Sequence, residues 1–263
     1  MNNSNYWINK SERSAKAQEH SRKMEQEFYG SIIVSYNNST IEDRNTVPVR
    51  LMEEVSGSAT MFLKMEDSVT AIFNAPKIKR LGVLNFASFK NPGGMFLKGS
   101  SAQEESLCHS STLYNILRRF DDSYYAYNRR NVNRSLYEDR AIYSPDVLFF
   151  NNDNGSIRYC DVITCAAPNK GAAMKYHGVS EEENIQALMS RIDFVFDIAK
   201  RKGITTLIIG AYGCGVFKQD AYDVAMIMKQ AMNMYPLNYI IAIPKGINYD
   251  KFMEVFSADT DEF

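Results

Sequence analysis

Apolar and polar residues follow each other in blocks along the chain, and the spacing within each block predicts one element. A mostly apolar run, Leu81–Phe86, predicts a buried strand. Apolar residues at helical spacing predict a helix over residues 103–120. A capping box of Ser180 and Glu183 begins another helix, which extends to about Lys202. The remaining predicted helices are residues 8–28 and 220–234, and the remaining predicted strands are residues 146–150, 158–164, 205–209 and 239–243.

Polar segments predict the connections between these elements. They lie at residues 37–45, 121–133 and 168–179, and we expect the segment 121–133 to be exposed. Strands alternate with helices through the second half of the chain, which predicts an α/β fold with a mixed or partly parallel sheet. No internal repeat or low-complexity linker interrupts this order. We therefore expect a single domain over residues 1–263, with an N-terminal extension at residues 1–65 and a core at residues 66–263.

Composition narrows the class of partner. Hydrophobic residues make up 45% and charged residues 23% of the chain, which is typical of a soluble globular protein. Lys and Arg number 30 against 31 Asp and Glu, so net charge favours neither nucleic acid nor an anionic membrane. The first residues lack a signal-peptide core, and no run is long and apolar enough to span a bilayer. We expect a cytoplasmic protein without direct nucleic-acid or membrane partners.

The cysteines predict neither a metal site nor a disulfide framework. Their spacing contains no Cys-x-x-Cys pair and matches no zinc template. Cys214 lies in a glycine-rich loop, but the residue two positions before it is Tyr212, whereas a nucleophile elbow has glycine there. We interpret the cysteines as reduced thiols, and we expect no metal or redox cofactor.

The candidate chemistry lies immediately after the strand Leu81–Phe86. Gly93 and Gly94 follow that strand, and glycines there let backbone N–H groups approach an anion without a Cβ in the way. Glu104 and Glu105 then begin the next predicted helix, a position that suits acid–base work. A phosphate-binding loop beside a proton donor predicts an enzyme acting on a sugar attached to a diphosphate.

Two separated motifs, taken together, indicate a protein family. Residues 85–94 read Asn-Phe-Ala-Ser-Phe-Lys-Asn-Pro-Gly-Gly and are followed by Gln-Glu-Glu at residues 103–105, while residues 210–217 read Gly-Ala-Tyr-Gly-Cys-Gly-Val-Phe. In this order they resemble the bacterial and fungal branch of the poly(ADP-ribose) glycohydrolases. The resemblance implies a macrodomain-like fold of three α/β/α layers, with a mixed sheet and an N-terminal helical extension. It also implies cleavage of ribose–ribose O-glycosidic bonds, releasing ADP-ribose from polymer or ADP-ribosylated protein.

The resemblance assigns roles to the matching residues. Glu105 matches the catalytic acid, and Glu104 matches the residue that holds the ribose hydroxyls. The family signature has three glycines before Gln-Glu-Glu, and Met95 stands in place of the third, where a side chain is expected to crowd the loop or force φ into an unfavourable region. The substrate-binding residues implied are Asn91, Gly93, Gly94, Met95 and Gln103 around the first loop, and Gly213, Cys214, Gly215, Val216 and Phe217 in the second.

Within this set the two loops are expected to grip the diphosphate, Phe217 to pack on the distal ribose or the adenine side, and Asn91 to lie beside the scissile ribose. Two alternatives remain open from sequence. One is a non-catalytic module that binds ADP-ribose or a related nucleotide signal, in which Met95 prevents hydrolysis. The other is a hydrolase of mono-ADP-ribosylated protein.

Overall fold

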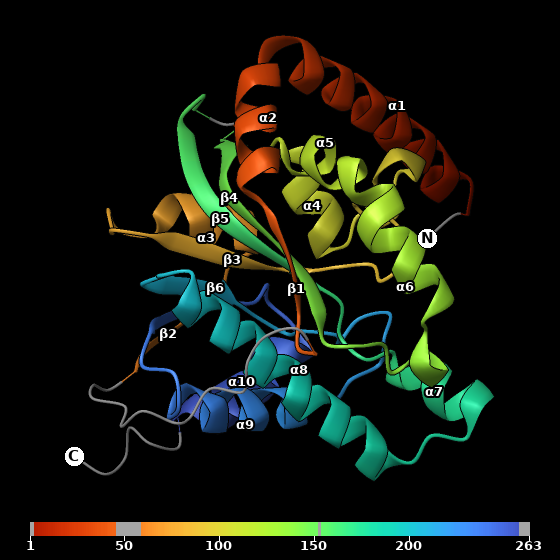
Figure 1. Ribbon diagram of the computed structural model, residues 1–263, viewed down its shortest axis with the longest axis vertical. Helices are drawn as coiled ribbons and strands as arrows, with labels where there is room; N and C mark the ends of the chain where they lie inside the picture. The colour runs from red at the N-terminus through yellow and green to blue at the C-terminus, as the bar shows by residue number, and fades with distance from the viewer. Residues whose placement is uncertain (1–2, 46–58, 152–153, 258–263) are drawn as a thin grey trace.

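The computed structural model describes residues 3–45, 59–151 and 154–257, and its centre is a seven-stranded sheet (Figure 1). The strand order is β1-β4-β5-β3-β6-β7-β2. β5, β3, β6, β7 and β2 run parallel, whereas β4 and β1 are antiparallel to their neighbours. The strands are β1 Thr40–Asp43, β2 Thr60–Lys64, β3 Leu81–Phe86, β4 Arg140–Phe150, β5 Ile157–Cys165, β6 Thr206–Ile209 and β7 Asn238–Ala242.

Helices cover both faces of the sheet and complete three layers (Figure 1). One apolar core lies between the sheet and a layer that includes α1, α2, α4 and α5, and the other between the sheet and α8, α9 and α10. No helix among the described residues is long and apolar enough to cross a membrane. The helices are α1 Asn3–Glu27, α2 Tyr29–Asn38, α3 Ser68–Asn74, α4 Gln103–His109, α5 Leu113–Leu117, α6 Ala126–Arg130, α7 Lys170–His177, α8 Glu181–Arg201, α9 Ala221–Met232 and α10 Ile247–Ser257.

The direction of the parallel strands indicates where a ligand would bind, at their carboxyl ends. Because β3, β6 and β7 are parallel neighbours, their carboxyl ends at Phe86, Ile209 and Ala242 meet at one edge of the sheet. Both glycine-rich loops leave this edge. The mixed α/β sheet and the strands predicted from apolar runs are therefore confirmed, with β4 starting six residues before its predicted start.

Four local predictions are wrong. Residues 37–45 contain the end of α2 and the strand β1, which pairs with β4. The helix predicted over residues 103–120 breaks after α4, because Thr112 N donates to Leu148 O and Phe150 N donates to Ser110 O. The supposed loop 168–179 contains α7, capped by Asn169 and ended by Gly178 at φ +61°. The segment 121–133 includes the buried residues Tyr124, Tyr125 and Asn128.

The segment expected as an N-terminal extension contributes both outer strands of the sheet. β1 pairs with β4 at one side and β2 with β7 at the other. Residues 46–58, for which the sequence predicts no element, lie outside the described residues.

Candidate active site

Two neighbouring glutamates form the centre of the site, at the start of α4. Glu104 and Glu105 keep only 3% and 5% of their surface exposed. The first turn of a helix favours carboxylates electrostatically, since the backbone N–H groups there point toward them. The chain brings this turn back to the carboxyl end of β3, because Gln103 Oε1 accepts from Phe86 N and Gln103 Nε2 donates to Leu84 O. Gln103 therefore holds the helix to the strand.

Glu104 is held by groups from the end of β3. Its Oε1 accepts from Asn85 Nδ2 at 3.2 Å, and its Oε2 accepts from Ser88 N at 2.7 Å. Burial, and secondarily the negative charge of Glu105, raise the pKa of Glu104 to about 8. The raised pKa favours the neutral form of Glu104 at neutral pH. Sequence reasoning missed Asn85, although an amide inside an otherwise apolar strand is a signal for a buried partner.

Among the described residues, only backbone groups hydrogen-bond to the Glu105 carboxyl. Its Oε1 accepts from Met95 N at 2.8 Å, and its Oε2 accepts from Ala102 N at 2.9 Å. Both N–H groups belong to the loop between β3 and α4. The position of this carboxyl therefore depends on the shape of that loop.

The first glycine-rich loop wraps the two carboxyls. A Cβ on Gly94 would lie 2.6 Å from Glu105 Oε1 and 2.8 Å from Glu104 Oε2, and the φ of this residue is +61°. Gly93 N donates to Glu104, and Gly94 N donates to Asn91 O at 3.1 Å. The loop N–H groups thus bind protein acceptors. Glycine is required at position 94 both by its φ and by the closeness of the carboxyls.

Met95 does not strain the loop, and the expectation of an unfavourable φ at this position is wrong. Its φ is −109°, a value open to any residue, and its N–H serves Glu105. Its side chain is 38% exposed at the surface of the loop. Asn91 is also exposed and caps the turn through its carbonyl, so the structure places both residues at the rim of the glutamate pair.

The second glycine-rich loop follows β6. Its backbone N–H groups, unlike those of the first loop, are mostly without acceptors among the described residues. The backbone N–H groups of Gly213, Gly215, Val216 and Phe217 have no hydrogen-bond partner among the described residues. Val216 is 80% exposed, and a Cβ added to Gly215 would meet nothing within 4 Å. A run of free N–H groups in an exposed turn is suited to an anion.

Buried groups beneath the second loop hold its shape. Gln219 Nε2 donates to Pro168 O at 2.9 Å, and Gln219 N donates to Gly213 O at 3.1 Å. Gly213 has φ +77°, and a Cβ there would lie 2.8 Å from the Ala167 Cβ. Burial raises the pKa of the Cys214 thiol to about 12, so Cys214 is not a thiolate at neutral pH.

Phe217 lies at the end of the second loop and packs on Tyr137. The two rings meet edge to face, with centroids 5.9 Å apart. Tyr137 in turn stacks on Phe89 of the first loop, with centroids 4.1 Å apart and ring planes within 9°. The Phe217 ring, which the sequence predicts in the ligand site, is thus half-buried and contacts the first loop through Tyr137.

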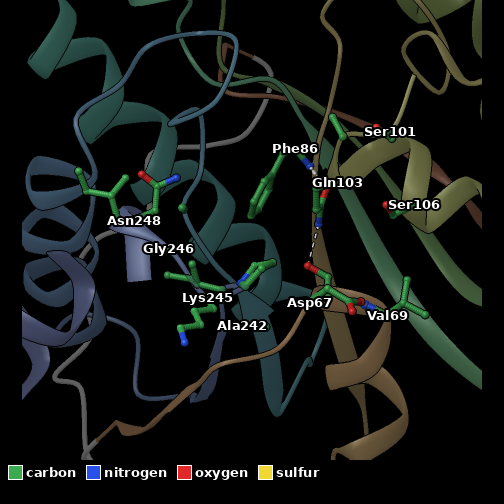
Figure 2. A pocket seen from close by; sticks show the side chains of 16 residues that line it. Asp67, Val69, Phe86, Ser101, Gln103, Ser106, Ala242, Lys245, Gly246 and Asn248 are labelled. Atoms are coloured by element: carbon green, nitrogen blue, oxygen red, sulfur yellow. Dashed lines mark hydrogen bonds between the residues drawn. The ribbon is translucent and has the colours of Figure 1, made fainter. Parts of the chain in front are cut away.

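A cavity of about 460 Å³ lies at the carboxyl ends of β3 and β7, beside the two loops, and neither glutamate lines it. Phe86 lines it from the end of β3, Ala102 and Gln103 from the start of α4, and Ala211 from the start of the second loop. Figure 2 shows Phe86 and Gln103 on one side of the cavity and Lys245 and Asn248, which follow β7, on the other, with Asp67 near the start of α3. Sequence reasoning missed this wall, because neither Asp67 nor residues 244–248 belong to a motif. The cavity is large enough for part of a nucleotide.

Helix α1 braces the first loop from behind. Arg13 Nε donates to Gly99 O at 2.8 Å, and Ser14 Oγ donates to Leu97 O at 2.6 Å. Gly99 has φ +76°, and a Cβ there would lie 2.2 Å from the Lys10 carbonyl oxygen. The helix backbone and the loop are therefore in direct contact. Among the described residues, no cluster of three His, Cys, Asp or Glu side chains could hold a metal ion.

Comparison with known proteins agrees with this geometry. The family profile of the microbial-type PARG catalytic domain, where PARG denotes poly(ADP-ribose) glycohydrolase, matches residues 2–152. The poly(ADP-ribose) glycohydrolase of Thermomonospora curvata bound to the inhibitor ADP-HPD is 26% identical, with a TM-score of 0.82 over 93% of this chain and 99% of that chain. The enzyme of Deinococcus radiodurans in complex with ADP-ribose is 28% identical, with a TM-score of 0.75 over 86% of this chain and 97% of that chain.

No curated protein sequence matches the chain. The profile covers more than half of the chain and includes both glutamates, and the structural likeness extends to the second loop. The family resemblance and the α/β fold expected from the sequence are confirmed. The chain belongs to the family of microbial-type poly(ADP-ribose) glycohydrolases, which are glycosidases.

Proposed function

We propose that the chain releases ADP-ribose from poly(ADP-ribose) by hydrolysing ribose–ribose O-glycosidic bonds, with Glu105 as the proton donor. The observation that carries the proposal is the buried pair Glu104–Glu105, held around Gly94 at the ligand-binding edge of the sheet. A buried carboxyl at the ligand-binding edge of the sheet can supply the general acid that a glycosidic leaving group needs.

The diphosphate fits the second loop rather than the first. The N–H groups of the first loop already bind Glu104, Glu105 and Asn91, whereas those of Gly213, Gly215 and Val216 are free among the described residues. The phosphates would therefore lie on the second loop, with the adenosine half in the adjoining cavity. This leaves the distal ribose between Phe217 and the two glutamates.

Catalysis then follows from proton transfer at Glu105. Glu105 protonates the oxygen of the leaving ribose as the bond from that oxygen to the anomeric carbon breaks, through an oxocarbenium-like transition state. The Glu105 carboxylate next takes a proton from water, whose oxygen bonds to the anomeric carbon. Glu104 holds the hydroxyls of the ribose, and its own position is fixed by Asn85 and Ser88.

The test is to incubate the protein with ADP-ribose polymer and, separately, with mono-ADP-ribosylated protein, and to quantify free ADP-ribose. Release from polymer by the wild type, lost in Glu105→Gln, supports the proposal. Release only from the mono-ADP-ribosylated protein would assign the other substrate. Tight ADP-ribose binding without release from either would assign a binding module.

A further inference from the structure

The segment of residues 133–137, just before β4, has a strained backbone although it contains no glycine. Asn133, Arg134, Ser135 and Tyr137 all have positive φ, at 41°, 49°, 67° and 63°. Residues other than glycine rarely adopt these angles, and a large aromatic residue does so least readily. Such strain persists only where surrounding contacts hold it, and it concentrates at functional sites.

The contacts that hold this segment come from three directions. Asn133 Nδ2 donates to Tyr137 O at 3.0 Å within the segment. Asn169 N, before α7, donates to Ser135 O at 2.9 Å. The buried Arg191 of α8 donates from Nη2 to Leu136 O at 3.3 Å. The backbone is therefore fixed in one shape just before β4 begins.

That shape places the Tyr137 ring between the two loops. β4 is antiparallel to β5, and Ala141 pairs with Cys165, so the start of β4 lies at the ligand-binding edge of the sheet. The Tyr137 side chain is 8% exposed, with one face against Phe89 and an edge contact to Phe217. Phe89 follows Ser88, whose N–H holds Glu104, and Phe217 ends the loop with the free N–H groups.

We propose that Tyr137 is a positioning residue that sets the Phe217 ring relative to the glutamate pair. The inference rests on the proposed function, because it takes Phe217 as the residue that packs on the distal ribose. Tyr137 itself acts through the neighbouring rings. Without its ring, Phe217 loses its buried contact and the two loops lose their shared support, so the anomeric carbon is held less accurately against Glu105.

The test is a double-mutant cycle with Tyr137→Leu and Phe217→Ala, following kcat and KM on polymer and the affinity for ADP-ribose by calorimetry. We expect Tyr137→Leu to lower kcat/KM roughly 10–100-fold, the range for small misplacement of a reacting group. We expect Tyr137→Phe to stay within about twofold, since the ring contacts to Phe89 and Phe217 remain and only the hydrogen bond between the Tyr137 hydroxyl and the Asn169 side chain is lost. In the Phe217→Ala background, Tyr137→Leu should have little further effect on kcat/KM.

Control variants separate positioning from general loss of packing. Tyr239→Leu removes another buried ring, which packs on Phe196, and should lower thermal stability without lowering kcat/KM. If Tyr137→Leu does not fold, Phe89→Leu breaks the same stack from the first loop and should reproduce the loss. Additive effects of Tyr137→Leu and Phe217→Ala, or wild-type kcat/KM in Tyr137→Leu, would overturn the inference. An inactive wild type would instead refute the proposed function.

Discussion

The first and second glycine-rich loops leave neighbouring parallel strands, β3 and β6, at the same edge of the sheet, and their backbone N–H groups are used differently. In the first loop the N–H groups of Gly93 and Met95 bind the carboxyls of Glu104 and Glu105. In the second loop those of Gly215 and Val216 have no partner among the described residues. Two loops with the same glycine-rich signal thus differ: one uses its N–H groups to hold carboxyls, and the other leaves its N–H groups free for the anion that we propose it binds.

The largest expected effect comes from the carboxyl that the first loop holds. Glu105→Gln keeps the shape of the side chain but cannot donate the proton, and loss of general acid catalysis typically costs about 10²–10⁴ in rate. ADP-ribose affinity should stay within a few-fold, because the second loop is unchanged. Rate assays on polymer with calorimetry in parallel measure both. Wild-type-like turnover by Glu105→Gln would show that Glu105 is not the general acid.

A matched pair of glycine substitutions compares the loops directly. Gly94→Ala puts a Cβ against both carboxyls at a positive φ, so we expect a loss of about 1–3 kcal/mol in stability together with most of the activity. Gly215→Ala adds a Cβ that meets nothing within 4 Å, so thermal stability should be unchanged.

In Gly215→Ala we expect only the affinity for ADP-ribose to fall, because the new methyl group would face the phosphates. Thermal melts and calorimetry on the two variants separate these outcomes. Equal losses of stability in both variants would show that the loops do not differ in the way described.

The protonated carboxyl of the first loop predicts a pH dependence. The pKa of Glu104 rises from 4.5 to about 8 on folding, because of burial first. Between these values folding takes up a proton, so this group makes the free energy of unfolding fall as pH rises. Glu104→Gln lacks this titration. The stability of Glu104→Gln relative to wild type should therefore increase between about pH 5 and pH 8, measured by denaturant unfolding; a constant difference would contradict the raised pKa.

On the second loop, Phe217→Ala should weaken ADP-ribose binding by roughly 1–3 kcal/mol, the range for loss of one stacking contact. Calorimetry with ADP-ribose gives the value, and a thermal melt confirms that the variant is folded. Unchanged affinity in a folded protein would mean that Phe217 serves only the contact with Tyr137.

The smallest effect is expected at Met95, where the sequence departs from the family signature. Its φ of −109° does not require glycine, so Met95→Gly should leave kcat/KM nearly unchanged and lower stability by about 0.5–1 kcal/mol. Kinetics on polymer measure the change in kcat/KM, and a thermal melt measures the change in stability. A large gain in kcat/KM would show that the Met95 side chain obstructs the ligand.

Sequence patterns predicted the parts of the molecule whose signals are local. The strand Leu81–Phe86, the capped helix α8 and the pair Glu104–Glu105 follow from runs, caps and motifs. The wrong predictions share a different cause. The strand β1 is short and polar, and it forms because β4 offers an edge to pair with. The break after α4 likewise depends on bonds to β4 from far along the chain.

The same distinction applies to the site. The sequence identifies both loops, but it does not reveal that one of them has its N–H groups occupied, because that depends on how the carboxyls fold back. Nor does it place Tyr137 beside Phe217, since 80 residues separate them and no motif includes the former. The helix α7 does have local signals in the sequence, because Asn169 is a favourable N-cap and Gly178 a favourable C-cap, but the polar composition of the segment favours a loop.

The contact between α1 and the first loop has a consequence for the order of folding. Arg13 and Gly99 are 86 residues apart in sequence, and the loop shape that holds Glu105 includes this contact. Closing so long a stretch of chain is slow relative to local structure, so the first loop should become ordered only after α1 has docked. The amide protons of residues 94–99 should then exchange with solvent as one cooperative unit with those of α1. Native-state hydrogen exchange that finds the loop opening while α1 remains protected would show that the two fold independently.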